Sequence, residues 1–197
     1  TIATVIATAL GTLAALGLSR PHMPYKGLIM AILISPMIVP LIITAAGMFF
    51  FYARINLVYT FTGVILAHVA LATPFVVITV TATLVGFDMN MVKAAQSLGA
   101  KPIRTFFKVI MPLILPGIIS GALFAFITSF DEVVIVMFMA SIDQLTIPKQ
   151  MWAGIRQEIS PVILCMATCL VLLSIFLLTT VELLRRRSEK LRGIKAR

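Results

Sequence analysis

Two acidic residues interrupt one of the apolar stretches of this 197-residue chain. Asp131 and Glu132 lie in the run 113–139, which is otherwise almost entirely apolar. Carboxylates in such surroundings are costly and often functional, because they attract cations along a transport pathway. They can also be structural, capping a helix or pairing with Lys149 or Arg156. The residue types therefore leave two interpretations open: a cation-attracting pathway lining or a structural pair.

The other side chains with catalytic or metal-binding chemistry do not form a recognisable site. The sequence contains no G-x4-G-K-[ST] phosphate loop and no Ser/His/Asp or Cys/His constellation. Cys165 and Cys169 have no further metal ligands nearby, so we interpret them as small packing residues. His68 lies within an apolar run, where a hydrogen bond between helices is favoured over proton relay. We expect no enzymatic activity and no cofactor in this chain.

A short segment between two apolar runs has the pattern of an amphipathic helix. Asp88 is a good N-cap residue, and Gly99 is a good C-terminal stop. Between them, four apolar residues recur at helical spacing and form one stripe: Met91, Ala94, Ala95 and Leu98. An element this short cannot bury its own stripe. We therefore expect the stripe to contact the rest of the protein, the lipid surface or another protein.

Long apolar runs must position these residues. The chain is 60% hydrophobic and 12% charged, with a mean hydropathy of +1.10, whereas soluble domains are about 45–50% apolar and about 25% charged. A spanning helix needs about 20 mostly apolar residues. Because the runs are continuous rather than alternating, they predict helices and not barrel strands. The expected spans are 1–18, 28–52, 60–86, 113–139 and 161–184.

Small residues and prolines inside these runs indicate how the helices pack. In the first run a small residue recurs every four positions, which predicts close helix packing: Ala3, Ala7, Gly11 and Ala15. Pro36 and Pro40 interrupt the second run, and Pro74 the third. Such prolines mark broken helices near a pathway in some transporters and simple kinks in other proteins. The sequence leaves both interpretations open.

The basic residues predict the orientation of the chain. If the tail 185–197 is cytoplasmic, only three of the 16 Lys and Arg residues fall on the outer side, namely Arg54, Lys149 and Arg156. This bias follows the positive-inside rule, so the net charge of +9 indicates membrane flanks and not nucleic-acid binding. The segment 87–112 is then cytoplasmic and Thr1 lies outside. We therefore expect one further span before residue 1.

Two stretches match a known pattern at fixed spacing. Residues 93–99 (KAAQSLG) are followed after nine residues by 109–112 (VIMP). They resemble the EAA loop of binding-protein-dependent ABC importers, E-A-A-x3-G-x9-I-x-L-P. Lys93 stands where the pattern has Glu, which reverses a charge. The stretches 129–134, 150–152 and 155–161 resemble spermidine/putrescine-type permease subunits, and the resemblance covers about 28–184.

The resemblance implies an all-α, polytopic membrane protein, the transmembrane domain of a type I ABC importer with six helices, five of them in this sequence. It implies a permease domain at 1–184 with a cytoplasmic coupling loop at 87–112, and a basic cytoplasmic tail at 185–197. The implied location is the bacterial inner membrane. The implied partners are a second permease subunit, a periplasmic substrate-binding protein, membrane lipid, and a cytoplasmic ATPase, which is where ATP is used.

The resemblance also assigns roles to residues. The expected ATPase-docking residues are Met91, Lys93, Ala94, Ala95, Leu98, Gly99 and Pro112. The expected substrate is a polyamine, with Asp131 and Glu132 along its pathway, although the binding protein usually sets specificity in such systems. The outer segment 145–159 is expected to be an amphipathic helix with Trp152 at headgroup level, facing the binding protein.

Three alternatives follow from the same residues. A secondary transporter or channel for a small solute would show inverted repeats and intramembrane charge networks, and we find no repeat and one acidic pair. A membrane scaffold without a transport role would leave the patterned loop unexplained. The loop helix itself could lie on lipid headgroups instead of docking, which its basic residues would suit.

Overall fold

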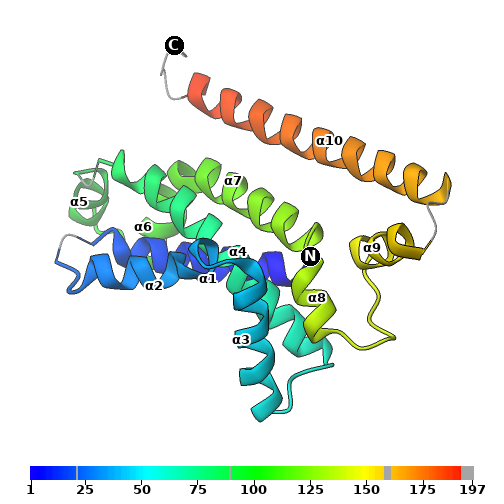
Figure 1. Ribbon diagram of the computed structural model, residues 1–197. Helices are drawn as coiled ribbons and strands as arrows, with labels where there is room; N and C mark the ends of the chain where they lie inside the picture. The colour runs from blue at the N-terminus through cyan, green and yellow to red at the C-terminus, as the bar shows by residue number, and fades with distance from the viewer. Residues whose placement is uncertain (21, 89, 158–160, 192–197) are drawn as a thin grey trace.

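The apolar runs form helices. The structure is a computed structural model that describes residues 1–191 except 21, 89 and 158–160. Every regular element of the described part is helical (Figure 1). The elements are α1 (Ile2–Leu18), α2 (Lys26–Ile38), α3 (Leu41–Arg54), α4 (Phe61–Val85), α5 (Asn90–Ser97), α6 (Pro102–Thr105), the π-helical turn η1 (Phe106–Ile110), α7 (Met111–Phe130), α8 (Val134–Met139), α9 (Ile147–Gln157) and α10 (Pro161–Leu191).

Among the described residues, three helices are long and apolar enough to cross a membrane. They are α4 with 25 residues, the continuous helix Pro102–Phe130 with 29, and Pro161–Thr180 with 20. We call Pro102–Phe130, which comprises α6, η1 and α7, the α6–α7 helix. The bent pair α2–α3 is a fourth candidate span, and α1 is a shorter apolar helix. The five predicted runs are thus all helical, which confirms the all-α class.

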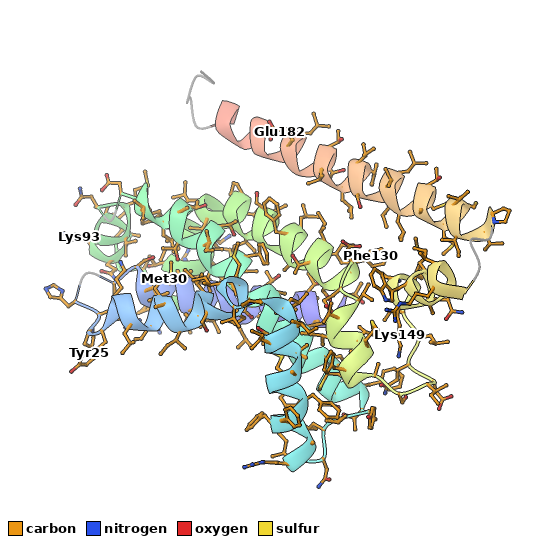
Figure 2. The ribbon with its side chains drawn as sticks, viewed as in Figure 1. Tyr25, Met30, Lys93, Phe130, Lys149 and Glu182 are labelled. Carbon is orange, nitrogen blue, oxygen red and sulfur yellow. The ribbon has the colours of Figure 1, made fainter. Side chains whose placement is uncertain are left out.

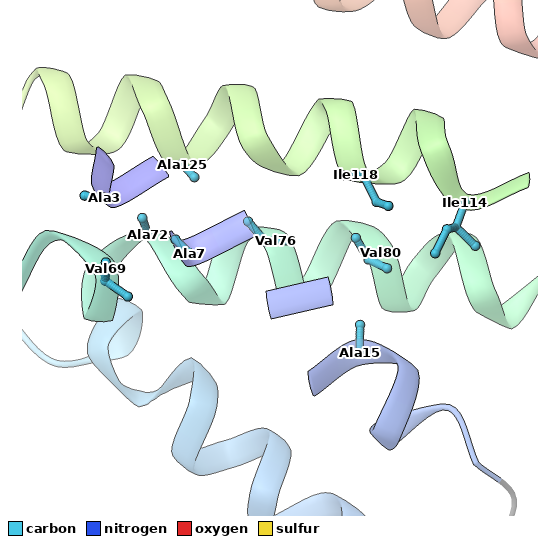
Figure 3. Close-up of a cluster of buried hydrophobic side chains, with 10 residues drawn as sticks. All are labelled: Ala3, Ala7, Ala15, Val69, Ala72, Val76, Val80, Ile114, Ile118 and Ala125. Carbon is cyan, nitrogen blue, oxygen red and sulfur yellow. The ribbon is translucent and has the colours of Figure 1, made fainter. Parts of the chain in front are cut away.

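The core is built on α4, which packs against both α1 and α7. The small-residue stripe of α1 is buried there, as predicted: Ala3, Ala7, Gly11 and Ala15. Val76 of α4 lies at the centre of the contact (Figure 3). A Cβ atom added at Gly11 would lie 2.6 Å from the Cβ of Val76. Because lipid is as apolar as these side chains, this close approach, and not exclusion from water, holds the helices together.

The second apolar run is a broken helix. α2 and α3 meet at an angle of 105°, so the run 28–52 is not one straight span. Val39 adopts an extended conformation and Pro40 follows it. Proline lacks the N–H that would continue the helix and disfavours helical geometry in the residue before it. Pro36 and Pro74, in contrast, stay inside α2 and α4.

The fourth run differs from its predicted bounds of 113–139. Its helix begins earlier, at Pro102, and ends earlier, at Phe130, before the separate short helix α8. The π-helical turn η1 lies just before Pro112, whose missing N–H would leave the Lys108 carbonyl unpaired in a regular helix. The helix therefore continues through the prolines, and the break falls at Asp131.

The last helix, α10, begins at Pro161 as predicted and contacts α7 and α9. No residue of its most apolar stretch is buried in the described part of the chain. Cys165 and Cys169 are free and exposed on this helix. The prediction that they are packing residues is therefore wrong for the described part of the chain. In a membrane, such a surface contacts lipid or another subunit.

We predict that Gly11→Val lowers the stability of the folded protein, because the new side chain meets Val76 at a helix crossing. Overpacking of this kind costs about 1–3 kcal/mol. The measurement is the thermal unfolding midpoint in detergent. Gly17→Val is the matched control, since a Cβ there meets nothing within 4 Å. Equal midpoints for the two variants would contradict the assigned α1–α4 contact.

Candidate functional site

The short helix α5 has defined ends, as the sequence predicts. At its start, the Asp88 Oδ1 accepts a hydrogen bond of 2.9 Å from the Asn90 N–H. At its end, Gly99 has a φ of +80°. The N–H groups of Gly99 and Ala100 donate to the carbonyls of Gln96 (2.9 Å) and Ala95 (3.0 Å). This pair of bonds is a Schellman motif, which needs the left-handed conformation that glycine adopts without strain.

The apolar stripe of α5 remains largely uncovered. α5 lies against α6 and η1, but Met91 is 49% exposed and Leu98 is 89% exposed. Ala94 is exposed, and Ala95 is half-buried. The described part of the chain therefore does not use most of this stripe, which is left available for lipid or for another protein.

The structure brings six of the seven expected docking residues together on α5 and its C-terminal turn: Met91, Lys93, Ala94, Ala95, Leu98 and Gly99. Pro112 is the exception, because it lies in the first turn of α7, beyond η1. Figure 2 shows Lys93 on α5 and Phe130 at opposite ends of the α6–α7 helix. One continuous helix thus extends from the neighbourhood of α5 to the acidic pair.

A second candidate site lies where two helix breaks meet. A cavity of about 650 Å³ is lined by residues 36–41 at the α2–α3 break, by Leu71 and Phe75 of α4, and by 127–128 and 131–134 at the α7–α8 break. Backbone that leaves its helix at membrane depth is tolerated where it is buried in protein or lines a cavity. Broken helices that meet at such a cavity are the usual setting of transport sites.

The two acidic residues have different environments in this cavity. Glu132 is 6% exposed, and its two carboxylate oxygens accept hydrogen bonds from the N–H groups of Ile135 (3.0 Å) and Val136 (3.2 Å). It thereby caps α8, which is one of the structural roles left open by the sequence. Asp131 is exposed at the cavity, and no hydrogen bond or ion pair engages its carboxylate in the described part of the chain. Asp131 is therefore the carboxylate free to meet a ligand.

Neither acid pairs with the basic residues considered from the sequence. The Lys149 Nζ donates to the Ser141 carbonyl at 3.5 Å, and no ion pair involving Arg156 occurs among the described residues. Helix ends add to the charge at the cavity. The C-terminal ends of α2 and α7, with their partial negative charge, lie beside Asp131, and the capping carboxylate of Glu132 offsets the positive end of α8. The arrangement favours a cation.

A hydrogen bond fixes the end of α7 that carries Asp131. The His68 Nδ1 on α4 and the Ser129 Oγ on α7 lie 2.9 Å apart, and His68 is 6% exposed. This confirms the predicted bond between helices. Ser129 was the part that sequence reasoning missed, because nothing in a one-dimensional pattern pairs two polar residues 61 positions apart.

The outer amphipathic segment also forms a helix. Ile147, Met151 and Ile155 lie on α9, and Trp152 is about half exposed. Ile159 and the predicted cap Ser160 lie outside the described residues. α8 and α9 lie at one end of the bundle and α5 lies at the other (Figure 1). This arrangement agrees with α5 and α9 lying on opposite sides of a membrane.

Comparison with known proteins gives a consistent result. Residues 7–190 match the family described as "binding-protein-dependent transport system inner membrane component". The chain is 30% identical over 187 residues to the spermidine/putrescine transport system permease protein PotC of Haemophilus influenzae, covering 95% of this chain and 73% of PotC. It is 37% identical over 103 residues to the putrescine transport system permease protein PotI of Escherichia coli, covering 52% and 37%.

A solved structure of the MetNI methionine ABC transporter, in an inward-facing conformation, has the same fold. It superposes with a TM-score of 0.66 at 19% identity, covering 99% of this chain and 90% of that one.

We predict that His68→Ala and Ser129→Ala are not additive in their effect on stability. Hydrogen bonds between membrane helices contribute about 0.6 kcal/mol on average and about 1.7 at most. A double-mutant cycle on unfolding in detergent should therefore give a coupling energy in that range. The cycle cancels the cavity left by the imidazole. A coupling energy of zero would show that the bond does not hold α7 to α4.

Proposed function

Because this chain belongs to the family of binding-protein-dependent transport system inner membrane components, we propose that it couples ATP hydrolysis by a cytoplasmic ATPase to the import of a polyamine. It is a multi-pass inner-membrane ABC importer permease, a non-catalytic type of subunit. The family assignment decides against the secondary transporter, the channel and the scaffold. The coupling and the substrate are the proposed parts.

The exposed stripe of α5 is the observation that carries the coupling proposal. A short helix with firm caps and an uncovered apolar face suits a groove on a partner protein. α5 is attached to the α6–α7 helix, which reaches the cavity at Asp131. Movement of a docked ATPase would therefore displace a rigid helix whose far end lines the candidate pathway.

The substrate proposal rests on Asp131 and on the relatives. A free carboxylate and two helix C-termini at a cavity attract ammonium groups, and a low local dielectric strengthens this attraction. The names of the two relatives refer to spermidine and putrescine. In this proposal a periplasmic binding protein delivers the polyamine on the α9 side, a second permease subunit completes the pathway, and the C-terminal tail is cytoplasmic.

We predict that Ala94→Phe uncouples hydrolysis from uptake, because the ring would hold the ATPase away from α5. Uptake per ATP should fall about tenfold or more, the change expected when about 1.4 kcal/mol of coupling is lost. Ala31→Phe, at an exposed position on α2 outside the docking helix and the cavity, is the control. Ser97→Cys should in addition form a disulfide with a cysteine in the ATPase groove. If positions 91–99 never crosslink and are shielded by lipid instead, α5 is a membrane-surface helix.

We predict that Asp131→Asn reduces spermidine uptake about tenfold, equivalent to about 1.4 kcal/mol, without lowering the yield of assembled complex. Glu132→Gln should lower the yield of assembled complex and leave transport per complex unchanged. The reason is that an amide offers one acceptor oxygen, whereas the carboxylate accepts two N–H groups. The paired measurement is transport per complex and complex yield in detergent. Normal spermidine transport by Asp131→Asn would remove the electrostatic argument for a cationic substrate and leave the importer assignment intact.

A further inference from the structure

The surface around α5 is basic and lacks internal counter-charges. Lys93 on α5 is exposed, and in the described part of the chain no ion pair or hydrogen bond engages its ammonium group. Lys101, Arg104 and Lys108, on the adjoining start of the α6–α7 helix, are exposed as well. The single acid of the segment 86–112 is Asp88, whose carboxylate caps α5. Whatever covers this surface must supply negative charge.

The length of the α6–α7 helix indicates which basic residues lie at the level of the lipid headgroups. Its 29 residues extend roughly 44 Å at about 1.5 Å per residue, whereas the hydrocarbon core is about 30 Å thick. The excess falls at the Pro102 end, where the basic residues are, since the stretch from 113 to Phe130 is apolar. Lys101, Arg104 and Lys108 recur at i, i+3 and i+7, so they share one side of the helix near headgroup level. Lipid phosphates can neutralise these three residues.

Lys93 is not one of these three headgroup-level residues. It lies on the separate helix α5, which packs against α6 and η1 at the end of the bundle (Figure 1). Residues are about 100° apart on a helix, which places Lys93, Ala94 and Ser97 on one side of α5. All three are exposed, while Val92 and Ala95 on another side are half-buried. Lys93 therefore borders the apolar stripe at Ala94 on the exposed side of α5, where a groove wide enough to receive the stripe would extend over it.

We propose that the ATPase groove that receives α5 carries an aspartate or glutamate opposite Lys93, and that this ion pair selects the matching ATPase. The inference rests on the proposed function, because it requires α5 to dock. An ammonium group covered by a partner without a counter-charge loses its hydration and gains nothing in return. The EAA pattern has Glu at this position, so a groove with a carboxylate attracts this subunit and repels one with Glu.

The test uses the complete permease pair, reconstituted without its ATPase in phosphatidylcholine vesicles, and the separately purified ATPase of the same system. Lys93→Glu should raise the Kd of the ATPase about tenfold or more, and Lys93→Arg should leave it within about twofold. Lys26→Glu, the same charge change at an exposed residue of α2, is the matched control and should leave the Kd unchanged. A zero-length carbodiimide should join the Lys93 amine to an ATPase carboxylate as an amide. Lys93→Arg should lose that crosslink while retaining binding.

Once the crosslink identifies the ATPase carboxylate, the charges of the two partners can be swapped. Changing it to lysine should weaken binding to the wild-type subunit and restore binding to Lys93→Glu. An unchanged Kd for Lys93→Glu, with a Ser97→Cys crosslink still formed, would overturn the ion pair but leave docking standing. Absence of any crosslink from Ser97 would instead remove the docking itself. If Lys93→Glu acts only when phosphatidylglycerol is present, the counter-charge is lipid and the proposal is wrong.

Discussion

The architecture depends on how closely α1 and α7 approach α4. In a membrane the apolar side chains gain little by leaving lipid, so helices associate where small side chains allow backbone to approach backbone. Ala7, Ala72 and Ala125 have no exposed surface, and the α1 backbone at Gly11 is close to Val76. This contact makes α4 the fixed element against which the other helices are placed.

The polar features of the chain are organised around that fixed helix. α4 provides His68, which holds the end of α7, and Leu71 and Phe75, which form one wall of the cavity. The two helix breaks then fall on either side of the same wall. Each break frees backbone groups that lipid cannot satisfy, and the structure meets this demand locally. The carboxylate of Glu132 serves the start of α8, which leaves Asp131 as the uncommitted charge.

The α6–α7 helix connects α5 to the cavity at Asp131. It begins beside α5 and ends at the cavity. It passes through Pro112 and Pro116 without breaking, and η1 widens the turn before Pro112. A force applied at α5 would therefore reach Asp131 through one helix and not through a flexible loop. At the α5 end of this helix, Lys93 places a positive charge on the proposed docking surface, where the EAA pattern has the negative charge of Glu.

The sequence alone determined the elements that depend on local chemistry. Continuous apolar runs predicted the five helical regions, and Asp88 and Gly99 predicted both ends of α5, since caps and left-handed glycines act within a few residues. The small-residue stripe predicted that α1 packs closely, and Pro161 marked the start of α10. The EAA spacing predicted the family.

Only the tertiary structure decided how these elements meet. The bond from His68 to Ser129, the junction of the two helix breaks and the division of roles between Asp131 and Glu132 all depend on contacts between distant segments. The sequence could not supply them because lipid-facing and helix-facing side chains are equally apolar in a membrane protein, so hydrophobic periodicity does not identify partners. The same limit explains why the fourth span was placed too far along the chain: apolarity continues past Phe130, and the helix ends there because Glu132 caps a new one.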